Sequence, residues 1–186
     1  RTLAFTRNPS DTDVSPATYT ADGASDLVLV DQQRDIAIDG SDSEDNLRVS
    51  AAALASNALY NFDVRGFEGD DTISFNAALI QDSVINGNVG NDTMNLGTAF
   101  GGGAVNFNNS YFLGGKGNDT LFAENINDGE VNGNIGNDTI DIENVGASGF
   151  NQYVGGGQGN DAITISGNFT DSIIDGNKGI DTIIIE

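Results

Sequence analysis

The stretch GGKGNDTLF, residues 114–122, sets three glycines directly before Asp119 and a short apolar segment. Similar nonapeptides recur along the chain, and each has an aspartate at its sixth place. They are GFEGDDTIS (66–74), GNVGNDTMN (87–95), GNIGNDTID (133–141), GGQGNDAIT (156–164) and GNKGIDTII (176–184), with a weaker copy GSDSEDNLR (40–48) and a remnant ADGASDLVL (21–29). We call the aspartates at this place the anchors and number other positions from them. The anchors are Asp26, Asp45, Asp71, Asp92, Asp119, Asp138, Asp161 and Asp181.

Neighbouring anchors are 19 to 27 residues apart. A repeat of this length, sustained over most of the chain, is typical of a solenoid in which successive coils stack on one another. The repeats therefore predict the fold class before any single element is considered.

Each nonapeptide indicates a tight turn between two short strands. Glycine at positions −5 and −2 fits a turn that needs a positive φ or a close approach of two backbones. Apolar residues at −7, and at +2 and +4 in alternation with outward residues, predict an inward-facing strand on each side of the turn. The glycines at −5 are Gly40, Gly66, Gly87, Gly114, Gly133, Gly156 and Gly176, and those at −2 are Gly69, Gly90, Gly117, Gly136, Gly159 and Gly179.

The predicted fold is all-β. It is a parallel β-roll or β-solenoid of about seven to eight coils, with two strands per coil. Glycine-rich turns lie along one edge, and loops of variable length, such as those at 50–58 and 97–106, lie along the other.

The composition restricts the function. The 186 residues include 28 acidic and 7 basic ones, with a net charge of −21 and with no histidine or cysteine. Nucleic acid is not an expected partner, because phosphate binding needs a basic patch, and no apolar run is long enough to insert into a membrane as a helix. No Ser–His or Cys–His pair can form, and acidic pairs arise by repetition rather than in one cleft. We therefore expect that the chain is not an enzyme.

Stacking of the coils brings the anchor carboxylates into one column. Two carboxylates about 5 Å apart repel by roughly 3 kcal/mol at an effective dielectric of 20. Only Lys116 and Lys178 lie in the turns, which is too few to neutralise the column. Calcium accepts six to eight oxygens, backbone carbonyls included, and is the simplest counter-ion. The predicted ligands are the anchors from Asp45 to Asp181 and the carbonyl oxygens of the glycines at −5 and −2.

The stretch GGKGNDTLF resembles the nonapeptide of the RTX (repeat-in-toxin, hemolysin-type calcium-binding) family. The other copies are similar to it, and the copy at 40–48 is degraded. The resemblance implies a parallel β-roll with calcium between coils at each turn, secretion, and folding outside the cell. The metal-binding aspartate of the family corresponds to Asp71, Asp92, Asp119, Asp138, Asp161 and Asp181.

The chain departs from the family in one respect. Typical rolls of the family carry the nonapeptide on both edges, whereas this chain has one per coil. We therefore expect several calcium ions in a single row along the glycine-turn edge. This arrangement looks like the RTX-type repeats of large bacterial adhesins, some of which bind ice.

Position −10, on the opposite edge, alternates strictly between Asp and Asn. The spacing alternates with it, so the true unit is a double coil of 43–47 residues. Two interpretations remain open for this column: a ladder of hydrogen-bonded Asx turns that needs no ion, and a second row of calcium ions. The residues are Asp35, Asn61, Asp82, Asn109, Asp128, Asn151 and Asp171.

The two ends suggest assembly. Residues 1–25 hold both prolines and lack the full repeat, so we expect an N-terminal cap or assembly segment there and the calcium-binding roll over 26–186. The segment TLAF (2–5) is a candidate to pair with the apolar C-terminal strand of another copy, which predicts head-to-tail self-association. Since the sequence opens at Arg1 without Met or an apolar leader, a processed form or a fragment is expected.

The expected function is a non-enzymatic, secreted, calcium-stabilised structural module. It would be a building block or spacer of a cell-surface layer, filament, appendage or adhesin. One alternative is an adhesin segment that binds ice or a polysaccharide through the loops at 50–58 and 97–106. The other is the export and folding module of a secreted enzyme. The outward threonines at +1 form only a single file, broken by Ala162, which is thin for an ice-binding face.

Overall fold

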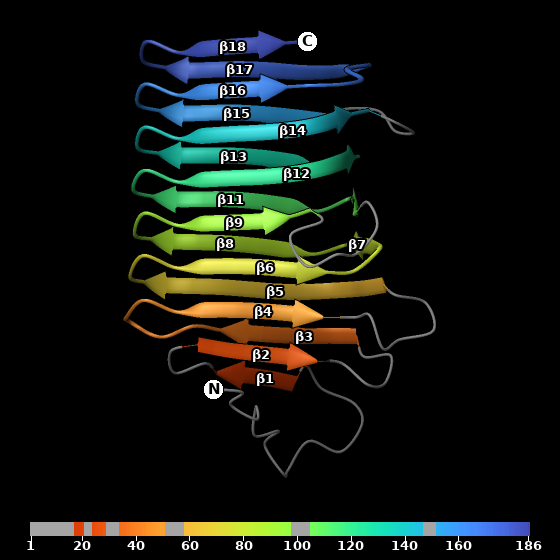
Figure 1. Cartoon of the computed structure of the whole chain (residues 1–186), viewed down its shortest axis with the longest axis vertical. Helices are drawn as coiled ribbons and strands as arrows, with labels where there is room; N and C mark the ends of the chain where they lie inside the picture. The colour runs from red at the N-terminus through yellow and green to blue at the C-terminus, as the bar shows by residue number, and fades with distance from the viewer. Residues whose placement is uncertain (1–16, 21–23, 29–33, 51–57, 98–104, 147–151) are drawn as a thin grey trace.

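The computed structural model of the chain describes residues 17–20, 24–28, 34–50, 58–97, 105–146 and 152–186. In this part of the chain the regular secondary structure is all strand, without a helix, and the strands join into one 18-stranded sheet. Every strand pairing among these residues is parallel, so the chain winds as a β-solenoid, and Figure 1 shows its coils stacked along the long axis.

The strands that precede the glycine turns form one face, which we call the upstream face. Its members pair in the order given, each with the equivalent strand of the next coil. They are β1 (Ala17–Thr20), β3 (Arg34–Asp39), β5 (Ala58–Glu68), β8 (Val84–Val89), β11 (Tyr111–Lys116), β13 (Glu130–Ile135), β15 (Gln152–Gln158) and β17 (Ser172–Lys178).

The strands that follow the turns form the downstream face, in the same order and register. Thr120 pairs with Thr93 on one side and with Thr139 on the other, so equivalent repeat positions lie side by side. The strands are β2 (Ala24–Val28), β4 (Asn46–Ser50), β6 (Thr72–Asn76), β9 (Thr93–Leu96), β12 (Thr120–Asn127), β14 (Thr139–Val145), β16 (Ala162–Ile165) and β18 (Thr182–Ile185). The tight turns between the two faces align along one edge of the stack, on the left of Figure 1.

A third, short face was not predicted. Residues 58–60 of β5 pair with β7 (Leu79–Gln81), β7 pairs with β10 (Asn106–Asn108), and β10 pairs with residues 125–127 of β12. The expectation of two strands per coil is therefore incomplete, since several coils contain this additional short segment. Most of its inward residues lie twelve positions before an anchor, and these are Leu59, Ile80, Phe107, Ile126 and Phe169. Val145, which pairs with Ile126 and Phe169 and is fully buried, lies sixteen positions before Asp161.

The core lies between these faces, and the predicted inward positions fill it. The apolar residues at −7, +2 and +4 are at most 2% exposed from Ile38 to Ile165. Burial of each such side chain contributes about 1.5–3 kcal/mol. The last coil differs: Ile183 and Ile185 of β18 are 43% and 53% exposed, because in the described part of the chain β18 has a neighbouring strand only in β16.

The ladder extends into the segment 1–25, because β1 pairs in register with β3, and Ala17 lies opposite Ile36. The rest of that segment, residues 1–16 and 21–23, lies outside the described residues, as does TLAF (2–5). Most of the loops at 50–58 and 97–106 lie outside them too.

The third face gives a test of the packing. Phe107 is fully buried, and its ring centroid lies 5.9 Å from that of Phe112. We expect Phe107→Ala to lower the free energy of unfolding by about 3–5 kcal/mol, because it opens a cavity in the core. Urea denaturation followed by circular dichroism measures this. Tyr111→Ala, at a position 51% exposed, is the control, and equal losses in the two variants would contradict a third buried face.

Candidate metal centre

The anchor aspartates lie inside the glycine turns, between the upstream and downstream faces. Six of them are only 1–2% exposed although they are acidic: Asp45, Asp71, Asp92, Asp119, Asp138 and Asp161. Asp181, in the last coil, is partly exposed. From Asp45 to Asp181 each coil places its anchor at the same register, so these carboxylates form the column that the sequence predicted. The prediction for Asp26 was wrong: in the pairing of β2 with β4 it lies opposite Arg48, three positions beyond the level of Asp45, because the remnant copy does not keep the repeat spacing.

Hydrogen bonds between coils fix one oxygen of each carboxylate. The backbone N–H of one anchor donates to Oδ1 of the anchor in the next coil, as in the bond from Asp92 to Asp119 at 2.8 Å. The same bond, at 2.8–2.9 Å, recurs at every step from Asp45 to Asp181. The column is therefore a continuous ladder, and its direction of hydrogen bonding is uniform.

The second oxygen of the carboxylate has no partner. Oδ2 is buried and makes no hydrogen bond in Asp71, Asp92, Asp119, Asp138 and Asp161. A buried polar atom without a partner costs about 1–3 kcal/mol, and more when it carries charge. The same deficit repeated in successive coils indicates that the folded chain needs a partner that the protein itself does not provide there.

Asp45, in the degraded copy, is different. Its Oδ2 accepts hydrogen bonds from the backbone N–H of Ser41 at 2.5 Å and from the Ser41 hydroxyl at 2.9 Å. Serine at this place closes the turn with protein groups alone. Asp45 therefore matches the predicted position but lacks the free oxygen that a metal site needs.

The glycines at −5 leave space next to Oδ2. A Cβ added to Gly114 would lie 2.5 Å from Oδ2 of Asp119 and 2.6 Å from the carbonyl oxygen of Gly133 in the next coil. The glycines at 40, 66, 87 and 133 face the same pair of oxygens. A carboxylate oxygen and a carbonyl oxygen thus converge on one side of each glycine, where any side chain would collide with both.

The glycines at −2 have a steric role. Gly90 has φ of 150°, and a Cβ on it would overlap the carbonyl oxygen of Gly69 in the preceding coil. The same close approach links each later glycine at −2 to its predecessor. These positions let the turns stack, and their carbonyl oxygens stay predicted ligands.

Burial raises the pKa of the anchors. The pKa of Asp71 and Asp119 rises from 3.8 to about 7, and that of Asp92 and Asp138 to about 6. Desolvation is the largest cause, the backbone N–H of the preceding anchor opposes it, and neighbouring carboxylates add to it. The repulsion that the sequence analysis stressed is therefore secondary to the loss of hydration.

A second ladder, which the sequence analysis missed, runs outside the first. The residue before each anchor from Asp71 to Asp161 is exposed, and its Oδ1 accepts the backbone N–H of the same position in the next coil. The bond from Asn118 to Asn91 is 2.8 Å long, and equivalent bonds run from Asp70 to Ile180. The asparagine that recurs directly before the anchor, in the GND of several nonapeptides, is the sequence feature that could have predicted this ladder. This ladder secures the turn backbone and leaves the anchors to face inward.

In the Asx column on the opposite edge, Asp82 and Asn109 find side-chain partners within the protein. Nδ2 of Asn109 donates to Oδ1 of Asp82 at 2.6 Å, and Gln81 donates to Oδ2 of Asp82 at 3.1 Å. The backbone φ at position −10 lies between 44° and 57° from Asn61 to Asp171, which Asn and Asp tolerate. These contacts favour the Asx-turn ladder, while Asn151 and the side chain of Asp35 lie outside the described residues.

The oxygen atoms in the turns are of the kind that a hard cation binds, but one turn alone offers few of them. Calcium prefers oxygen ligands at flexible geometry, and the turns of Asp71, Asp92, Asp119 and Asp138 each offer an unpartnered carboxylate oxygen beside a carbonyl oxygen. Among the described residues no three acidic, His or Cys side chains gather in one cluster. An ion in the column would therefore have to draw on successive coils and on backbone oxygens.

Comparison with known proteins finds no matching family model, no matching curated protein and no matching solved structure. Within the described part of the chain no helix has the length and apolar character of a membrane span.

The raised pKa values predict how stability depends on pH in metal-free buffer. Asp71, Asp92, Asp119 and Asp138 keep their protons in the folded state above pH 3.8, so their stabilising contribution is present below 3.8 and is lost as pH rises through 6–7. For a group such as Asp71 the loss is on the order of 4 kcal/mol. In metal-free buffer, circular dichroism with urea should show a cooperative unfolding transition at pH 5, and at pH 8 a chain that is already unfolded before urea is added. Stability that is equal or higher at pH 8 would contradict the buried column.

Proposed function

We propose that the chain is a non-enzymatic, calcium-stabilised structural module that works outside the cell. It would be a building block or spacer of a surface layer, filament, appendage or adhesin, with a roll of about seven to eight coils. The observation that carries the proposal is the row of buried, unpartnered carboxylate oxygens from Asp71 to Asp161.

A row of calcium ions would meet the need of this column. The oxygens available are Oδ2 of the anchors and the carbonyl oxygens of the glycines at −5, as at Asp119 and Gly133. Calcium supplies the positive charge that the buried carboxylates lack. The chain supplies the rest: the N–H ladder holds Oδ1, which orients Oδ2, and the glycines keep the space beside it free of side chains.

Such a module suits a mechanical role. Each coil of a solenoid contacts mainly its neighbours, so stability is a sum of coil and interface contributions. Neutralising one carboxylate per coil would strengthen every interface in the same way. The product is a stiff rod whose length is set by the number of repeats, which is what a spacer requires.

The absence of an enzymatic site is part of this proposal. The carboxylates are repeated and equivalent, whereas acid–base catalysis needs two groups in distinct environments. Arg65, one of the arginines that could face a substrate, is engaged with Asp39 at 2.9 Å and stacks on Phe67. The export-module alternative has no support beyond the resemblance to the RTX family.

Calcium should control folding at neutral pH. We expect the metal-free chain at pH 7.5 to be expanded and poor in β-structure, and addition of calcium to restore the roll, because the site forms only on folding. Circular dichroism and small-angle scattering with and without calcium measure this. Magnesium at the same concentration is the control, since it tolerates this flexible geometry poorly. A fully wound chain in metal-free buffer at pH 7.5 would disprove the proposal.

The variant Asp119→Asn separates the role of Oδ1 in the hydrogen-bond ladder from the proposed role of Oδ2 in binding calcium. Asparagine keeps an acceptor for the N–H of Asp92 but removes the buried charge. The variant should be more stable than the unmodified chain without calcium, and should need at least about tenfold more calcium for half-maximal stabilisation. Asp141→Asn, at an exposed position outside the column, is the matched control. An unchanged calcium response in Asp119→Asn would argue against a metal in the column.

Self-association is a separate proposal. In this chain β18 exposes Ile183, Ile184 and Ile185 by 43–53%, and an open apolar strand favours pairing with another copy. Sedimentation of the purified chain in calcium should show species larger than the monomer as concentration rises. A strictly monomeric chain at high concentration would remove head-to-tail assembly and leave the calcium proposal intact.

A further inference from the structure

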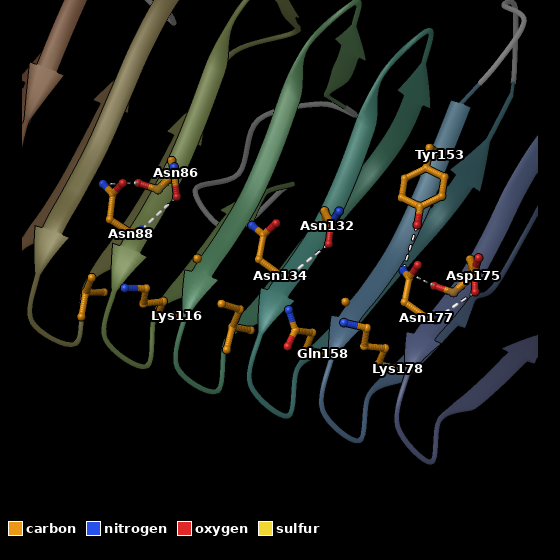
Figure 2. Close-up of a pocket in the computed structure, with 14 residues that line it drawn as sticks. Asn86, Asn88, Lys116, Asn132, Asn134, Tyr153, Gln158, Asp175, Asn177 and Lys178 are labelled. Carbon is orange, nitrogen blue, oxygen red and sulfur yellow. Dashed lines mark hydrogen bonds between the residues drawn. The ribbon is translucent and has the colours of Figure 1, made fainter.

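The outer surface of the upstream face carries a groove close to the glycine turns. It has a volume of about 870 Å³ and crosses β8, β11, β13, β15 and β17. Figure 2 shows its polar side chains in rows that run from strand to strand. It lies outside the anchor column, because the anchors face inward and the groove residues face outward.

The groove floor alternates between amide side chains and bare backbone. Position −4 is Asn in β8, β13 and β17, and Gly in β11 and β15. The glycines are required, because a Cβ on Gly115 or Gly157 would overlap the backbone of Asn88 or Asn134 in the preceding coil. Amide groups therefore stand on alternate strands, at intervals of about 10 Å, with gaps between them.

Hydrogen bonds fix a second set of groove amides, two residues earlier at position −6, and the −4 amide of Asn177. The backbone N–H of Asn88 donates to Oδ1 of Asn86 at 2.9 Å, and that of Asn134 donates to Oδ1 of Asn132 at 3.0 Å. At the end of the groove Nδ2 of Asn177 donates to the hydroxyl of Tyr153 at 2.8 Å, as Figure 2 shows. The polar surface is thus organised before any ligand arrives.

The charge of the groove differs from that of the molecule. Lys116 and Lys178 are the only lysines of a chain with a net charge of −21, and both line the groove. Neither forms an ion pair with another described residue. They lie three strands apart on β11 and β17, a distance of about 14 Å along the stack. Asp175 is the single acidic residue of the lining.

We propose that this groove binds an extended acidic polysaccharide. Side-chain amides and a tyrosine hydroxyl suit sugar hydroxyls, and the strand spacing is close to the length of one sugar in an extended glycan. Val89 and Ile135, 42% and 45% exposed, offer apolar contact to sugar rings, and the two lysines match carboxylate or sulfate groups. A peptide fits less well, because the groove lies on a sheet face whose backbone groups are already paired and not on an open edge.

This binding role goes beyond the structural role and does not rest on calcium in the column. The two can fail separately: folding with and without calcium tests the column, and ligand binding to the folded chain tests the groove.

The test measures binding of a hyaluronan octasaccharide, which alternates a uronate with a neutral sugar, by calorimetry in calcium-containing buffer. A neutral cello-oligosaccharide and an oligoglutamate peptide serve as comparison ligands. We expect hyaluronan to bind and both comparison ligands to bind much more weakly. Lys116→Gln combined with Lys178→Gln should weaken hyaluronan binding about tenfold, the size expected for two exposed ion pairs. Position −3 already holds Gln158 in β15, so glutamine suits the fold there.

Two matched variants control for charge and folding. Asn106→Asp with Ser166→Asp adds the same negative charge at exposed positions outside the groove and should leave binding unchanged. Lys116→Arg with Lys178→Arg should retain binding, and circular dichroism confirms that each variant is folded. Absence of hyaluronan binding, equal binding of the neutral glycan, equal binding of oligoglutamate, or no effect of the glutamine variant would each overturn the proposal.

Discussion

The structure depends on burying one carboxylate in every glycine turn. Stacking requires the turns to be thin, so glycine occupies positions −5 and −2 and the aspartate side chain fills the interior. Its Oδ1 is used to tie one coil to the next, and its Oδ2 is left without a partner in successive coils. The fold is therefore linked to the protonation of these groups, or to a cation beside them, because a buried charge needs one or the other.

The two edges of the stack use different buried polar groups to link successive coils. On the opposite edge buried serines take the place of the anchors: the N–H of Ser83 donates to the hydroxyl of Ser110 at 2.9 Å, and that hydroxyl donates to a backbone carbonyl. These groups are neutral and satisfied by the protein alone. The repeated row of unpartnered carboxylate oxygens is therefore a feature of the glycine-turn edge, while the core between the edges is held by apolar packing.

The inward and outward residues of the turns vary to different degrees. The inward residue of the nonapeptide is always aspartate, since it must continue the ladder. Position −3, directly beside the groove, varies among Glu68, Val89, Lys116, Ile135, Gln158 and Lys178. Because these side chains point outward, they can change without affecting coil stacking. A stable rod can thus present different surfaces, and the cluster of both lysines on one face is of this kind.

The sequence by itself determined the parallel all-β architecture, the inward positions at −7, +2 and +4, and the anchor column, because each depends on a residue repeated at fixed spacing. The third face was missed although Phe107 and Ile126 lie at the constant position −12, since variable loops separate them from the preceding anchor. Only the tertiary structure decided that Oδ1 is satisfied and Oδ2 is not, that Ser41 replaces a partner at Asp45, and that Asn and Gly alternate along a groove. These features arise between coils, from atoms about 20 residues apart in the chain, so no pattern within one repeat contains them.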